Sequence, residues 1–225
     1  MRRLASLFVL FAGSLAFAQA PIGVDVVLEK RYGVAGNLEF YPQSSAKDAL
    51  NSAAKLLEKK RYSYILAHIV DPTLVDDRVA KKAQKLTAAV EKELDAKRSE
   101  QKASAKSGLT FDEQIPLDPF GFAERVKAEA TKRAFESLVK ELESNLGEAP
   151  EQVLQLMRFA KEGVITENGP TASVAVKEIM GKQVYLKQAD SIGFKEGLNL
   201  DGKRALVKQT VTRWHLEDRQ TEVAK

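Results

Sequence analysis

Apolar residues recur at helical spacing through the first two thirds of the chain, and the first such stretch has a clear start. The residues that share its apolar face are Leu50, Ala53, Ala54 and Leu57. Their i, i+3, i+4, i+7 spacing is typical of one face of a helix. Ser45 and Asp48 stand three residues apart, which is a capping-box arrangement with Asp in place of Glu. The pattern predicts a helix near 46–60, after a short extended segment and an irregular stretch within 21–43.

A second, shorter helical face follows and is expected to end at Asp71-Pro72, because the residue before proline disfavours helical geometry. Its apolar positions are Tyr62, Ile65, Leu66 and Ile69. A thin apolar stripe then predicts a long, partly exposed helix over 78–106. A broader stripe predicts another over 120–146 that packs on the core and stops at Gly147. The stripe residues are Val79, Ala83, Leu86, Val90 and Leu94 for the first, and Phe122, Val126, Ala130, Phe135, Leu138, Val139, Leu142 and Leu146 for the second.

After a last predicted helix from Pro150 to Gly163, the apolar period changes from helical to alternating. Strands are predicted at 164–166, 174–176, 184–186, 206–207 and 214–216. Turns are expected at 168–170 and 180–182, and the stretch 193–204 is glycine-rich with an expected turn tip at Asp201-Gly202. Helices followed by strands indicate an α+β fold, with N-terminal helices packed on a C-terminal curved antiparallel sheet.

The N-terminus carries the three-part pattern of a secretory signal peptide. Arg2 and Arg3 precede an apolar stretch over 4–17 that ends in small residues, and we expect cleavage after Ala18. An uncleaved anchor is the alternative, but the stretch is shorter than the roughly 20 residues of a spanning helix. No later stretch is apolar for long enough to cross a membrane, so we predict an exported protein, periplasmic or extracellular.

Composition narrows the chemistry further. The chain has no cysteine and two histidines, His68 and His215, so disulfides, a cysteine nucleophile and a histidine-built zinc site are not expected. No phosphate-binding loop, nucleophile elbow or metal-binding motif is present, and no cofactor or metal is predicted. The formal net charge is +4, and it falls to +2 if Arg2 and Arg3 are removed with the signal peptide. Nucleic-acid binding therefore ranks last, and the basic stretch 78–106 is better explained as a solvated helix face than as an anion-binding surface.

The order of elements resembles the NTF2-like cone fold, on the stretch 62–72 together with Arg213-Trp214-His215-Leu216-Glu217-Asp218. The pairing of 57–62 with 214–220 is similar to a group of exported, uncharacterised planctomycete proteins. The resemblance covers about 46–72 and 150–220, and the long helices between them depart from a compact cone. It implies a curved sheet that can enclose a pocket. Proteins with this fold include isomerases, dehydratases, ligand carriers and inert accessory domains, so the fold alone does not choose a function.

Enzymatic cones of this kind tend to use aspartate, histidine and tyrosine facing the pocket, which makes His68, Asp71 and Tyr64 the candidate acid–base residues. The candidate ligand-binding residues are Tyr185, Trp214 and His215. A histidine between apolar neighbours, like His68, is more often packed than catalytic. Adjacent strand residues point to opposite faces, so Trp214 and His215 are expected to do so.

Three functions remain open at this point. The leading hypothesis is an exported, non-catalytic binding or accessory protein, whose partner would be a small molecule or an envelope protein. The second is a small-molecule isomerase or dehydratase that uses acid–base residues in a cone pocket. The third is a helical arm for protein–protein interaction or for formation of a homodimer. The expected organisation is a signal peptide at 1–18, a lead-in at 19–45, one domain at 46–220 with an arm at about 76–146, and a tail at 221–225.

Overall fold

The computed structural model describes residues 26–105, 115, 118–179, 182–198 and 203–217. Its helical elements are α1 (Ala46–Glu58), α2 (Tyr62–Tyr64), the π-helix η1 (Ile65–Ile69), α3 (Pro72–Ala105), α4 (Pro119–Glu148) and α5 (Pro150–Glu162). Its strands are β1 (Val26–Leu28), β2 (Val164–Asn168), β3 (Thr171–Ala175), β4 (Gln183–Leu198) and β5 (Arg204–Glu217). The predicted signal peptide and the predicted turn tip at Asp201-Gly202 lie outside the described residues.

The fold is α+β, with an open antiparallel sheet built around the long strand β4. One edge of β4 pairs with β5 from Tyr185 to Leu198. β3 and β1 pair with successive parts of the other edge, and β2 pairs with β3. Near its C-terminal end the outer edge of β5 is covered, because Trp214 N donates to the Gln43 carbonyl and the Leu216 carbonyl accepts from Asp71 N. The sheet, with helices packed on it, is consistent with a cone-like arrangement.

The core of the body lies between the sheet and two helices. Trp214 and Leu186 pack with Val174 on one face of the sheet, and α1 and α5 cover them with residues such as Leu50 and Phe159. Ser45 caps α1 as predicted, its hydroxyl accepting from Asp48 N at 3.0 Å. On the opposite face, Val211 packs with Leu38 of the segment between β1 and α1. Arg213 donates to Gln43 of that segment and to the His68 carbonyl of η1.

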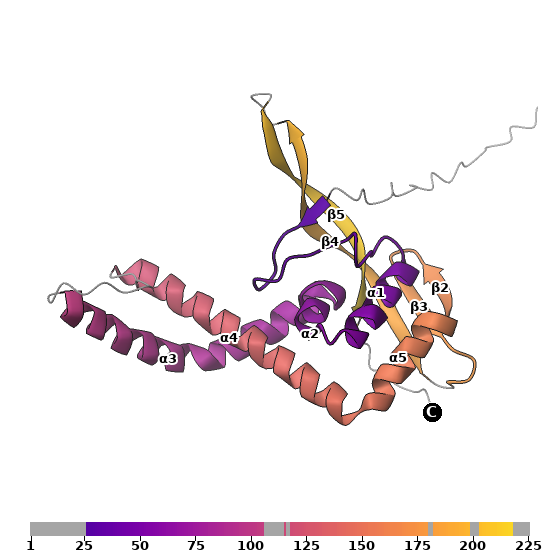
Figure 1. Ribbon diagram of the computed structural model, residues 1–225, viewed down its shortest axis with the longest axis horizontal. Coiled ribbons are helices and arrows are strands. Elements are labelled where there is room, and N and C mark those ends of the chain that lie inside the picture. The colour runs from indigo at the N-terminus through magenta and orange to yellow at the C-terminus, as the bar shows by residue number, and fades with distance from the viewer. Residues whose placement is uncertain (1–25, 106–114, 116–117, 180–181, 199–202, 218–225) are drawn as a thin grey trace, which may run out of the picture.

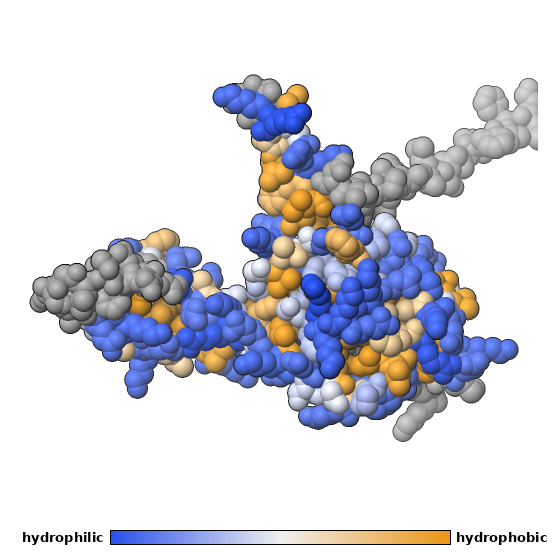
Figure 2. Space-filling view, viewed as in Figure 1, coloured by the Kyte–Doolittle hydropathy of each residue, from blue (hydrophilic) through white to orange (hydrophobic). Residues whose placement is uncertain are grey.

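Two projections leave this body (Figure 1). The antiparallel helices α3 and α4 form an arm on one side, and the outer part of the β4–β5 ribbon extends on another. The arm has its own apolar seam, formed by Val90, Leu94, Phe122, Val126 and Ala130. In the space-filling view the two projections are separated by open space (Figure 2).

Several boundaries differ from those predicted, for physical reasons. Pro72 begins α3 instead of only ending the preceding helix, since proline suits a first helical turn. Gly147 lies inside α4 and does not stop it, because Pro150 sets the break instead. The predicted strands at 206–207 and 214–216 are one strand, β5, and Gly193 and Gly197 of the glycine-rich stretch lie in β4. Gly193 is required there, because an added Cβ would lie 2.6 Å from Val26 Cγ1.

The predicted packing of the 120–146 helix on the core is only partly right. Phe122, Val126 and Ala130 of α4 pack on α3 within the arm. Farther along α4, Phe135 and Leu138 pack with Ala67 of η1 as well as with α3. Leu142 and Leu146 contact the apolar cluster of α1 and α2. The turn at 168–170 is as predicted, with Gly169 in left-handed geometry at φ 59° between β2 and β3.

Candidate functional site

His68, the first predicted acid–base residue, is fully buried in η1. The π-helical geometry is set by the hydrogen bond from Val70 N to the Ile65 carbonyl at 2.9 Å. The Nε2 atom of His68 lies 3.0 Å from the Val34 carbonyl, so Nε2 carries the proton. That leaves Nδ1 as the acceptor, and it has no hydrogen-bond partner among the described residues.

Tyr64 lies one turn before His68, and the two ring centroids are 4.9 Å apart. Its hydroxyl accepts a hydrogen bond from Asn37 N at 2.8 Å and donates one to the Asn37 carbonyl at 3.1 Å. Burial raises the pKa of Tyr64. The Tyr64 hydroxyl thus holds the loop at Asn37 in place both as a donor and as an acceptor.

Arg213, which the sequence analysis missed, lies at the centre of this buried region with 1% of its surface exposed. It donates to Gln43 Oε1, to Ser191 Oγ at 2.7 Å and to the His68 carbonyl at 3.4 Å. No carboxylate pairs with it within the described ranges, so neutral dipoles alone stabilise the cation. Burial lowers the pKa of Arg213 to about 10.

His215 completes the cluster on the same sheet face as Arg213. Burial, with Arg213 as the next cause, lowers the pKa of His215 to about 3. Burial also lowers the pKa of His68 to about 4, although its hydrogen bond to Val34 opposes that shift. Both imidazoles are therefore neutral at ordinary pH. The sequence could have indicated Arg213, because side chains two positions apart on a strand lie on the same face. If Trp214 faces the core, Arg213 and His215 share the opposite face.

Asp71, the third acid–base candidate, is held by its neighbours. Its Oδ1 accepts from Thr73 N at 3.1 Å, capping the start of α3, and its Oδ2 forms an ion pair with Lys187 Nζ at 2.6 Å. Trp214, 3% exposed, faces the core on the opposite side from His215, as predicted. Tyr185 is half-buried, opposite Glu217 in the β4–β5 register.

The open concave surface lies elsewhere, at the base of the arm. A tight turn over Arg31–Val34 builds it: Tyr32 and Gly33 have φ 52° and 82°, and the flanking residues exchange hydrogen bonds of 3.1 and 2.9 Å. Positive φ at both central positions is typical of a type I′ turn. Tyr32 occupies a position that favours glycine or asparagine, so the sequence Arg-Tyr-Gly did not indicate this turn.

The turn is fixed to both helices of the arm. The Tyr32 ring stacks on Phe135 of α4, with centroids 4.5 Å apart and planes 12° from parallel. The Tyr32 hydroxyl and Arg31 Nη2 each donate to Asp76 Oδ1 of α3 at 2.5 Å. Arg31 also donates to the Ala67 carbonyl at 2.8 Å. The 31–34 turn therefore joins the body to the arm.

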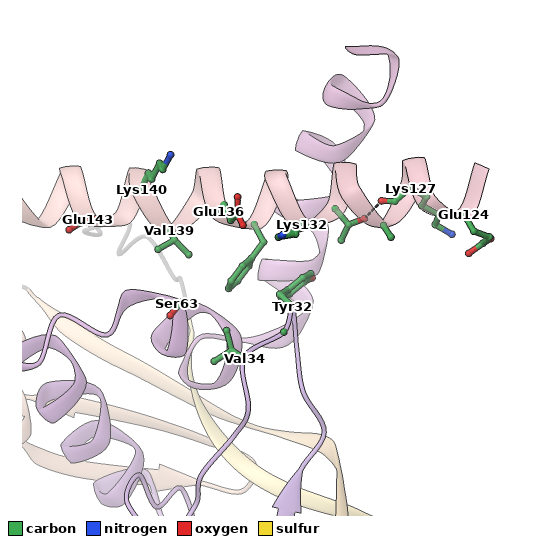
Figure 3. Close-up of a pocket in the computed structure, with 14 residues that line it drawn as sticks. Tyr32, Val34, Ser63, Glu124, Lys127, Lys132, Glu136, Val139, Lys140 and Glu143 are labelled. Carbon is green, nitrogen blue, oxygen red and sulfur yellow. Dashed lines mark hydrogen bonds between the residues drawn. The ribbon is translucent and has the colours of Figure 1, made fainter. Parts of the chain in front are cut away.

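Between this turn and α4 lies a groove of about 980 Å³, hereafter the arm groove (Figure 3). Its apolar floor is formed by Tyr32, Val34, Phe135 and Val139. Its other lining residues are Gly33, Ser63, Glu124, Lys127, Ala128, Thr131, Lys132, Glu136, Lys140 and Glu143. Three of these side chains are basic and three are acidic, so the rim has no dominant sign of charge.

A second groove of about 880 Å³ lies farther out on the arm, between α3 and the start of α4. Arg98 covers the Phe122 ring there, with Cζ 4.7 Å from the ring centroid. Neither groove is lined by any of the six candidate residues, namely His68, Asp71, Tyr64, Tyr185, Trp214 and His215.

The described residues contain neither a metal-binding cluster nor a membrane-crossing helix. No group of three or more His, Asp or Glu side chains there could hold a metal ion. No helix there is long and apolar enough to cross a membrane. Comparison of the chain with protein-family models, with curated proteins and with solved structures found no match.

Proposed function

We propose that this protein is an exported, non-catalytic binding protein that holds a segment of an envelope partner in the arm groove. The observation that carries the proposal is the groove itself, an aromatic and aliphatic floor between the 31–34 turn and α4 with charged rims. Export rests on the N-terminal pattern of residues 1–18. The NTF2-like resemblance, which includes inert accessory domains, is in keeping with this function.

The dimensions of the groove favour a polypeptide over a small molecule. Its lining on α4 runs from Glu124 to Glu143, which is about 28 Å at 1.5 Å per residue. Apolar anchors in the middle with charges of both signs along the edges suit an amphipathic helix laid along α4. Such a helix would place its apolar stripe on Phe135 and Val139, and its charged flanks beside Lys132, Lys140 and Glu136.

The isomerase or dehydratase alternative gains no support from this geometry. A general base needs hydrogen-bond reach to a substrate proton. His68 and Tyr64 are buried and hydrogen-bonded to backbone groups, and Asp71 pairs with Lys187 and caps α3. Their contacts favour a structural role in joining η1 to β5 and to the loop over 34–37.

The test is site-specific photo-crosslinking in the envelope of the native cell. A photoreactive phenylalanine analogue replaces Val139 in the groove, and in a matched strain it replaces Leu154, which is 62% exposed on α5. We expect a discrete adduct from position 139 only. Ala128→Trp, which fills the groove from an exposed helix position, should reduce that adduct about tenfold, whereas Lys161→Glu on α5 should leave it unchanged.

Three results would overturn the proposal. Equal adducts from positions 139 and 154 would show contact without a specific site, and an adduct insensitive to Ala128→Trp would place the contact outside the groove. An adduct of twice the chain mass would identify the occupant as a second copy, which would also contradict an envelope partner. A His68→Gln variant that folds should crosslink as well as the unchanged chain does.

A further inference from the structure

The outer part of the β4–β5 ribbon, beyond its pairing with β1, carries exposed apolar side chains. Leu198, Leu206 and Val207 are 68%, 62% and 42% exposed. The ribbon extends away from the body, and in the space-filling view apolar residues follow it outward (Figure 2). Side chains of this size at such exposure mark a contact surface when they cluster. The connecting residues 199–202 lie outside the described part of the chain.

The register places apolar residues on both faces of this outer ribbon. Leu198 pairs with Arg204 and Leu206 with Glu196, so these residues share one face. Val207 pairs with Lys195 and lies on the other face. A protein partner docked on one face would leave the other exposed to water. A lipid layer into which the outer ribbon inserted would cover both faces.

Basic side chains accompany the apolar ones on both faces. Arg204 and Lys208 lie on the face of Leu206, and Lys195 lies on the face of Val207. All three are exposed, and none forms an ion pair within the described ranges. The stretch 194–208 contains four basic and two acidic residues. An excess of cations beside apolar groups suits an anionic surface with an apolar interior.

From these observations we infer that the outer β4–β5 ribbon docks on an anionic lipid surface, with Leu198, Leu206 and Val207 entering the boundary between headgroups and acyl chains. Lys195 lies three residues from Leu198 along β4, which is about 10 Å at 3.3 Å per residue. That matches the roughly 5–10 Å to which interfacial elements penetrate. Lys195 and Lys208 then reach the phosphates, and Arg204 extends back to them along its aliphatic stem.

A second copy of the chain fits this surface less well. Antiparallel pairing of the free outer edges of two β5 strands would bring Arg204 and Lys208 close to their own counterparts. Basic residues on an edge strand oppose such pairing. The inference is independent of the arm groove, since the ribbon and the groove share no residue.

The test measures co-sedimentation with vesicles of phosphatidylcholine alone and of equal parts phosphatidylcholine and phosphatidylglycerol. The protein lacks residues 1–18, whose apolar stretch would itself bind lipid, and it keeps every described contact of the fold. We expect binding only to the phosphatidylglycerol vesicles. Leu198→Ser with Leu206→Ser should weaken it at least about tenfold, and Arg204→Glu with Lys208→Glu should do the same. The matched controls Leu154→Ser and Lys161→Glu, at exposed sites on α5, should bind like the unchanged chain.

A fluorescence measurement reports insertion directly, and it keeps the test decisive if the double variants fold poorly. Leu206→Trp adds one indole to a chain whose single tryptophan, Trp214, is buried. Its emission should shift to the blue on phosphatidylglycerol vesicles and not on phosphatidylcholine alone. The groove variant Ala128→Trp should sediment with vesicles as the unchanged chain does, which separates this inference from the proposed function.

Four outcomes would overturn the inference. The first is equal binding to both kinds of vesicle, and the second is loss of binding in the α5 controls as much as in the ribbon variants. The third is a concentration-dependent dimer that Leu198→Ser with Leu206→Ser abolishes while vesicle binding is absent, which would assign the ribbon to a second copy. An acidic polypeptide that binds the ribbon in place of vesicles would assign it to a protein.

Discussion

Gly36 and Gly147 differ in how much space a side chain would have. Gly36 lies against β1 and η1, and an added Cβ would be 2.6 Å from Leu28 Cβ and 3.1 Å from His68 Cε1. Gly147, inside α4, has nothing within 4 Å of the same added atom. Gly36→Ala should therefore lower the free energy of unfolding by about 1–3 kcal/mol through overpacking. Urea denaturation followed by far-ultraviolet circular dichroism measures this.

Gly147→Ala is the matched control, and the opposite sign is expected. Alanine in a helix loses less conformational entropy than glycine, so the variant should be neutral or more stable by up to about 1 kcal/mol. If Gly36→Ala proved as stable as Gly147→Ala, the loop at Gly36 would not be packed between Leu28 and His68 as described.

The neutral, buried histidines predict a loss of stability in mild acid. The folded-state pKa is about 4 for His68 and about 3 for His215, both lowered by burial. The unfolded chain binds protons near the ordinary histidine pKa of about 6.5. Stability is thus fully present above about pH 6.5 and falls as the pH drops toward 4. Between about pH 7.5 and pH 5 the free energy of unfolding should fall by roughly 2 kcal/mol for each histidine.

His215→Leu separates this effect from the titration of carboxylates. The variant removes one buried imidazole, so its unfolding free energy should fall by about half as much over the same pH interval. Carboxylates in the unfolded chain protonate mostly below about pH 5, so they contribute little in this window. Equal pH dependence in the two proteins would show that His215 does not titrate as a buried group.

At the scale of elements, the arm depends on its apolar seam. Leu94 of α3 is 6% exposed and packs in the cluster with Val90 and Phe122. Leu94→Ala should lower stability by about 2–4 kcal/mol, because it leaves a cavity between two helices. Hydrogen exchange should accelerate in α3 and α4 while the amides of β4 keep their protection. Leu154→Ala, at a site 62% exposed, should change stability by less than about 0.5 kcal/mol.

The helices were the more predictable elements, because their apolar spacing is local. Ser45, Pro150 and Gly163 mark helix ends that the sequence shows directly. The length of β5 was not predictable in this way: its middle residues alternate little in polarity, and only pairing with β4 makes 204–217 one strand. The π-helical turn at His68 was likewise hidden, since it depends on how Val70 meets Leu216 across the fold.

At the scale of the molecule, neither groove could be read from the sequence. The arm groove needs Tyr32, from a turn near the N-terminus, to stack on Phe135 more than a hundred positions later. The buried cluster likewise brings Arg213 to Gln43 and His68, which precede it by 170 and 145 positions. Residue types alone singled out His68, Asp71 and Tyr64. Their buried and paired states follow from packing that no local pattern encodes.

The two projections also predict the overall size of the protein in solution. A compact domain of the length left after residues 1–18 would have a radius of gyration of about 17 Å. α3 by itself spans about 51 Å, as 34 residues at 1.5 Å each, and the ribbon leaves the body in another direction. Small-angle scattering should therefore give a radius clearly above the compact value, with a long tail in the distribution of interatomic distances.

Because a dimer would also enlarge the radius, the forward scattering must first give the mass of one chain. A monomer close to about 17 Å would mean that the arm or the ribbon folds back onto the body, and would remove the exposed ribbon face from which lipid docking is argued.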